Sequence, residues 1–200
     1  YFFVADDPIG GAWLMLWKGA GVGFLALYAA FRTRGFDGLL IAGALTLGAL
    51  GDVTLEISFL IGGALFALGH AVAIILYLRN RRASTSSSQI LAGGSLLLLT
   101  PLIAGLIAYP LPNWIVATAY SAVVGGMAAA AWTSRFPRYR VGLGAVMFVV
   151  SDLLIFAREA AALPDFVTAW TIWPLYFGGQ FLIATGVVQT LRMDRRPDKT

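Results

Sequence analysis

Seven apolar runs separated by short polar stretches make up almost the whole chain. They cover residues 11–31, 38–56, 58–78, 89–109, 112–133, 140–157 and 167–191. Each is close to the roughly 20 residues that a helix needs to cross the hydrocarbon core of a bilayer. Backbone polar groups cannot be left facing lipid, so spanning runs of this length form helices. The pattern predicts an all-α, polytopic transmembrane helix bundle of seven helices, forming a single domain over residues 1–200.

Composition supports the membrane assignment and excludes or disfavours several kinds of metal site. Of the 200 residues 59% are hydrophobic and only 12% are charged, whereas about a quarter of the residues of a soluble domain are charged. The chain has no cysteine and one histidine, His70. Thiolate metal sites are thereby excluded and a histidine-rich zinc site is disfavoured. We expect no metal and no cofactor.

The basic residues predict the orientation of the bundle. Arginines gather in every second loop and after the last run, at residues 32–34, 79–82, 135–140 and 192–196. By the positive-inside rule these loops and the C-terminus are cytoplasmic. The net charge of +4 therefore reflects topology, and no nucleic-acid binding is expected. A composition rich in Arg, Ala and Gly points to a bacterial inner membrane.

Two aspartates lie inside apolar runs, Asp52 in the second and Asp152 in the sixth. An ionisable group in hydrocarbon costs roughly 2.5–3.5 kcal/mol on insertion scales, so it usually faces the bundle interior, a partner or a water-filled cavity. Structural alternatives are a buried pair of Asp152 with Lys18 and a wetted interfacial position for Asp52. Glu56 lies four residues after Asp52, on the same helical face and nearer to water.

Polar residues on the other helices fall at the same depth. With about 1.5 Å of rise per residue, one slab of the bilayer contains six of them: Lys18, Asp52, His70, Tyr120, Asp152 and Gln180. Each of the neutral residues could also serve only in packing or in hydrogen bonds between helices. Their agreement in depth favours a common buried site.

Short motifs across six of the runs resemble those of the YhhN family of lysoplasmalogenases. The resemblance extends from about Lys18 to Leu191, and it implies an eighth helix ahead of residue 1. Two positions depart from the family pattern, Gly19 in place of a proline and Ala73 in place of a tyrosine. The motifs are Gly51-Asp52-Val53-Thr54-Leu55; Phe59-Leu60-Ile61-Gly62 with Phe66 and His70; Tyr120 with Met127; Gly144-Ala145 with Phe148, Ser151 and Asp152; and Tyr176 with Gln180-Phe181-Leu182-Ile183 and Gly186.

The resemblance implies hydrolysis of the vinyl-ether bond of a lysophospholipid, a lysoplasmalogen, drawn from the surrounding membrane lipids. An enol ether is hydrolysed by proton transfer to carbon followed by capture of the oxocarbenium ion by water, so the site needs an acid and a nearby anion. Two carboxylates provide both, as in glycosidases. We expect Asp152 to donate the proton and Asp52 to stabilise the cation and orient water.

The remaining site residues are expected to bind the substrate. Lys18 would attract the phosphate, while His70, Tyr120 and Gln180 would hold the glycerol hydroxyl and water. Ser151 and Glu56 complete the predicted set. A proton-coupled small-molecule or lipid transporter is the main alternative, since it would use the same intramembrane carboxylates.

Three further classes of protein agree less well with the sequence. A retinal photoreceptor would need a lysine in the last helix, which has none, and a zinc-dependent amidase would need several histidines. A non-enzymatic lipid-binding protein differs from a hydrolase only in activity.

Overall fold

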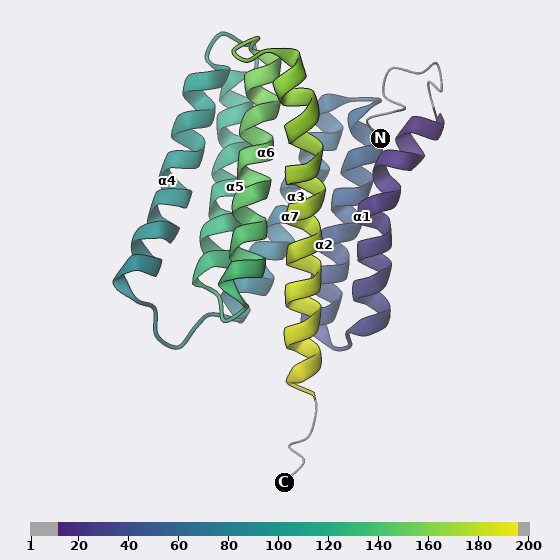
Figure 1. The fold of residues 1–200 in the computed structure, drawn as a ribbon, viewed down its shortest axis with the longest axis vertical. Coiled ribbons are helices and arrows are strands. Elements are labelled where there is room, and N and C mark those ends of the chain that lie inside the picture. Colours follow the sequence, from purple (N-terminus) through teal and green to yellow (C-terminus); the bar gives the residue numbers. More distant parts are fainter. Residues whose placement is uncertain (1–11, 196–200) are drawn as a thin grey trace.

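In the part of the chain that the structure describes, seven helices run in alternating directions and form one bundle (Figure 1). The computed structural model describes the backbone of residues 12–195 and the side chains of residues 17 and 19–195. A short π-helical turn, η1, leads directly into the sixth α-helix. The expected all-α bundle is confirmed, and each helix begins and ends within about one turn of the predicted bounds. The helices are α1 (Ala12–Arg32), α2 (Phe36–Leu55), α3 (Phe59–Arg79), α4 (Ser87–Ala108), α5 (Trp114–Thr133), α6 (Leu143–Glu159, after η1 at Arg138–Gly142) and α7 (Asp165–Met193).

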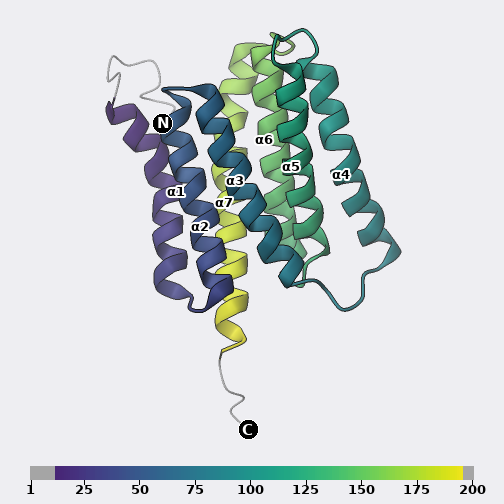
Figure 2. The same cartoon turned by 180° about the vertical axis from the view of Figure 1, so that it is seen from behind.

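Six of the helices form a closed ring. Around it, α1 contacts α2, α2 contacts α3, α3 contacts α5, α5 contacts α6, and α6 contacts α7, which closes the ring against α1 and α2. Helix α4 lies outside the ring, and of the described helices it packs against α5 and α6 alone (Figure 2). It is also the least buried of the long helices, and no predicted site residue comes from it. The ring interior is therefore built from six helices, with α4 as an outer support.

Large apolar side chains cover the outside of the bundle, whereas the core combines many alanines and valines with several leucines and isoleucines and a few aromatic rings. Six helices are long and apolar enough to cross a membrane, and the described apolar part of α1 adds Gly19–Arg32. A lipid-facing surface explains this distribution, since lipid tails do not drive large side chains inward as water does. The chain is an integral membrane protein.

The arginine-rich loops meet at one end of the bundle, called here the arginine end, where α1, α3, α5 and α7 finish (Figure 1). Buried Asn80 ties this end together. Its amide donates to Asp37 on α2 at 2.9 Å, and its side-chain oxygen accepts from Arg135 at 2.8 Å. Arg135 also pairs with Asp194 at 2.7 Å. These bonds fix α2, α3 and α7 relative to one another below the ring interior.

Two glycines allow a very close contact between two helices of the ring. A Cβ on Gly144 of α6 would lie 2.6 Å from the carbonyl oxygen of Gly179 on α7, and the converse distance is also 2.6 Å. Only glycine permits this approach of two backbones. It brings α6, with Asp152, against the part of α7 that bears Tyr176 and Gln180.

Candidate functional site

The two aspartates each accept a hydrogen bond from a tyrosine of another helix. The Tyr120 hydroxyl on α5 donates to Oδ2 of Asp152 on α6 at 2.8 Å. The Tyr176 hydroxyl on α7 donates to Oδ2 of Asp52 on α2 at 2.7 Å. Both aspartates are buried, with 9% of Asp52 and 6% of Asp152 exposed. A hydrogen bond of this length to an ionised carboxylate is among the strong ones in proteins.

The two pairs belong to a single site. The Tyr120 ring contacts the His70 ring, with 6.1 Å between ring centres, and the His70 ring in turn contacts Phe148. The Phe148 ring lies 5.3 Å from the Tyr176 ring, in an edge-on contact. The ring interior therefore holds two carboxylates in one desolvated, aromatic environment.

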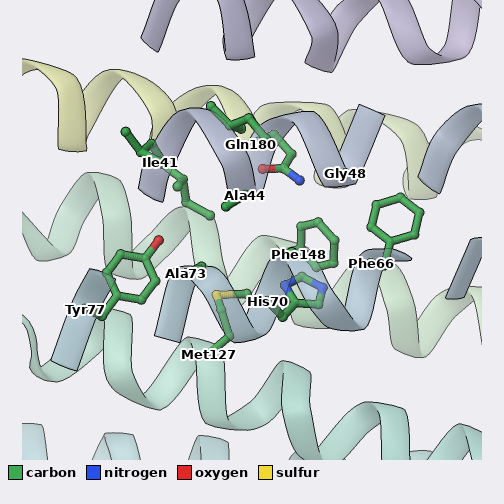
Figure 3. Close-up of a pocket in the computed structure, with 13 residues that line it drawn as sticks. Ile41, Ala44, Gly48, Phe66, His70, Ala73, Tyr77, Met127, Phe148 and Gln180 are labelled. Carbon is green, nitrogen blue, oxygen red and sulfur yellow. The ribbon is translucent and has the colours of Figure 1, made fainter. Parts of the chain in front are cut away.

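His70 joins the site through Tyr120 and the aromatic rings. Its Nε2 lies 3.5 Å from the Tyr120 hydroxyl, a long contact. Its imidazole packs edge-on against Phe148, with 4.7 Å between ring centres, as the adjacent side chains in Figure 3 show. Phe66, one turn earlier on α3, contacts both His70 and Tyr176. These contacts limit the rotation of the rings that surround the carboxylates.

The Gly51-Asp52 dipeptide has a packing explanation. A Cβ on Gly51 would lie 2.8 Å from two carbons of the Phe66 ring, so glycine lets α3 lie close to α2 beside the carboxylate. Asp52 follows directly, in the last turn of α2, where its side chain reaches Tyr176. The sequence thus places a small residue where the helices meet and a charged residue next to it.

The other predicted site residues lie at different distances from this centre. Gln180 is buried on α7, one turn after Tyr176 and on the same helical face. Ser151 is fully buried and donates to the Phe148 carbonyl at 2.7 Å. Glu56 lies at the C-cap of α2 and is exposed. Lys18 belongs to α1, but its side chain is outside the part of the chain that the structure describes.

The predicted set of site residues omitted Tyr176 and the rings of Phe66 and Phe148. All three belong to the motifs that carried the family resemblance, but no role was assigned to them. The available signal was spacing, because Tyr176 precedes Gln180 by four residues and so shares its helical face. Tyrosines in membrane helices are common near interfaces, so Tyr176 was not distinguished from an interfacial residue.

Among the described residues no three histidine, aspartate or glutamate side chains gather closely enough to bind a metal ion. The polar groups that the candidate site brings together include two carboxyls, two phenols, one imidazole and one amide.

A family model matches most of the chain, over residues 13–187. The chain belongs to the YhhN family. The match includes every helix that contributes to the site, so the resemblance suggested by the short motifs is confirmed. Comparisons with curated proteins and with solved structures gave no significant match.

Proposed function

We propose that this YhhN-family protein is a membrane hydrolase that cleaves the vinyl-ether bond of lysoplasmalogens, giving a fatty aldehyde and glycerophosphoethanolamine or glycerophosphocholine. The observation that carries the proposal is the pair of buried aspartates, each positioned by a tyrosine hydroxyl inside one ring of helices. Buried carboxyls in a bilayer indicate function by default, and this family includes lysoplasmalogenases.

The first step is proton transfer to carbon. Asp152 gives its proton to the vinyl carbon farther from the ether oxygen, and the adjacent carbon becomes an oxocarbenium ion. Because Tyr120 donates to Oδ2 of Asp152, the transferred proton sits on Oδ1. The Asp52 carboxylate, held by Tyr176, stabilises the cation electrostatically, as one of the two carboxylates does in a glycosidase.

Water then completes the reaction. Its oxygen bonds to the cationic carbon while Asp52 takes one of its protons, which gives a hemiacetal. The hemiacetal hydroxyl returns a proton to Asp152, the bond to the glycerol oxygen breaks, and that oxygen takes the proton from Asp52. One water is consumed and both carboxyls return to their starting states.

Aldehyde release tests the proposal. Purified protein in detergent should release aldehyde from lysoplasmenylethanolamine, with or without a chelator, and Asp152→Asn should abolish the release while the protein stays folded. In D₂O the aldehyde should carry one deuterium on the carbon next to the carbonyl. If Asp152→Asn and Asp52→Asn both release aldehyde at the wild-type rate, the mechanism is ruled out.

The same assay separates the hydrolase from a proton-coupled transporter of small molecules or lipids. A transporter would move its substrate across vesicles without releasing aldehyde, and the two aspartates would then govern proton coupling. The closed aromatic surroundings of both carboxyls favour chemistry on a bound substrate, since exclusion of water strengthens charge stabilisation of a cation.

We further propose that the arginine end faces the cytoplasm of a bacterial inner membrane, following the positive-inside rule. The two aspartates then lie in the outer half of the bilayer.

A further inference from the structure

A small cavity lies inside the ring, between the two carboxylates and the arginine end. Its volume is about 30 Å³, and its walls come from α2, α3, α5, α6 and α7 (Figure 3). A buried water needs about 10–15 Å³ measured in this way, so the cavity has room for one or two waters. Sites for lipid-sized ligands are larger, at roughly 300–1,000 Å³. Size alone therefore excludes a hydrocarbon chain.

The cavity has a polar group that the hydrolytic mechanism does not use. The Tyr77 hydroxyl is buried, and among the described residues it has no hydrogen-bond partner. Only 1% of the residue is exposed, and its ring is held edge-on against Phe136. Figure 3 shows the hydroxyl directed inward, toward Ile41 and Ala73, which also line the cavity. A buried hydroxyl is costly without a partner, and a water in the cavity would supply one.

The other polar residues of the cavity wall connect it to the candidate site. His70 and Gln180 both line it. His70 contacts Tyr120, the partner of Asp152, and Gln180 lies one turn after Tyr176, the partner of Asp52, on the same face of α7. Buried waters typically make two to four hydrogen bonds, and the hydroxyl, imidazole and amide provide enough groups. The cavity thus has one polar link toward each carboxylate.

We propose that this cavity is a water site, held by Tyr77, His70 and Gln180, and that it supplies the water consumed in hydrolysis. The supply role rests on the proposed function, whereas the binding of water does not. Water from the cavity passes between His70 and Gln180, its oxygen bonds to the oxocarbenium carbon, and its proton goes to Asp52. Both carboxylates are buried, and the cavity is the nearby space with room for the nucleophilic water.

Stability tests the water site without any substrate. Tyr77→Phe removes only the hydroxyl. If the hydroxyl binds water, its loss should lower Tm in detergent, because hydrogen bonds are lost. If the cavity is dry, removing an unpartnered buried hydroxyl should raise Tm, and that result would overturn the proposal. A high-resolution crystal structure should likewise show ordered water within hydrogen-bonding distance of Tyr77 Oη, and a dry cavity there would refute it.

Kinetics test the supply role. Ala73 is buried in the cavity wall between His70 and Tyr77, whereas Ala71, on the same helix, is exposed on the outer surface. Ala73→Val fills part of the cavity and should lower kcat about tenfold with KM unchanged, since substrate binding is not altered. The matched control, Ala71→Val, should keep wild-type kcat.

The outcomes separate this inference from the proposed function. Equal kcat for the two valine variants would overturn the supply role, while a wild-type protein that releases no aldehyde would overturn the proposed function and with it that role. If Ala73→Val does not fold, Tyr77→Phe tests the supply role instead. Its kcat should fall at constant KM, and an unchanged kcat would refute the supply role.

Discussion

The two tyrosine–aspartate pairs allow a quantitative test of the proposed chemistry. Tyr120→Phe and Tyr176→Phe each delete one hydroxyl that donates to a carboxylate, at 2.8 and 2.7 Å, and leave the ring in place. A hydrogen bond to a charged group contributes about 1.5–3 kcal/mol. At 1.36 kcal/mol per factor of ten, each substitution should lower kcat/KM by roughly 10–150-fold if the bond is needed in the transition state.

The double variant shows whether the pairs act together. If both carboxylates serve one transition state, removing the second hydroxyl from an already impaired site should cost less than removing it from the wild type. Independent pairs would instead multiply their effects. We expect the double variant to be less impaired than the product of the single effects.

The assay is continuous aldehyde release, coupled to an alcohol dehydrogenase, with kcat and KM measured for each variant. Tyr109→Phe is the matched control, because Tyr109 is exposed at the end of α4, outside the ring. It should keep wild-type rates. Values of kcat/KM within twofold of wild type for both Tyr120→Phe and Tyr176→Phe, in proteins with wild-type Tm, would refute a role for these hydrogen bonds in catalysis.

Three other predictions follow from the sequence and the fold. Lys18→Met should raise KM for the lysophospholipid several-fold with little change in kcat, and Lys18→Arg should restore KM; a fall in kcat alone would contradict phosphate binding. Gly144→Ala should destabilise the protein by about 1–3 kcal/mol, because the new Cβ meets the Gly179 carbonyl oxygen, whereas Gly94→Ala, with open space around it, should not lower the thermal unfolding temperature. The chain has no cysteine, so Arg81→Cys should be labelled by a membrane-impermeant maleimide only from the cytoplasmic side of intact membranes, and labelling from outside would reverse the proposed orientation.

The helix spans could be predicted because the bilayer fixes their length. Apolar runs of about 20 residues need no tertiary information to be identified, and the observed helices agree with them. The exception is the start of α6, which was expected as α-helix from residue 140. The chain there forms the π-helical turn η1 over Arg138–Gly142, and no local composition marks such a turn.

The order of helices around the ring could not be predicted in the same way. Lipid-facing and core-facing positions are both apolar in a membrane protein, so hydrophobic periodicity does not identify the inner face. Polar residues and glycines carry that information instead. Helix α4 has no charged residue, and the structure places it outside the ring.

The depth of each residue in the bilayer was the property that best predicted which residues belong to the site. Rise per residue placed Asp52, Tyr120 and Asp152 at one level, but depth does not say which partner each carboxylate has. That depends on the rotation of each helix, which is set by contacts such as that of Gly144 with Gly179. Tyr176 was missed for this reason, since its depth agrees with the site but only the rotation of α7 brings its hydroxyl to Asp52. The same rotation puts Gln180, one turn further along α7, into the cavity wall. One glycine contact thus positions both a carboxylate partner and a residue of the proposed water site, so Gly144→Ala should impair hydrolysis as well as stability.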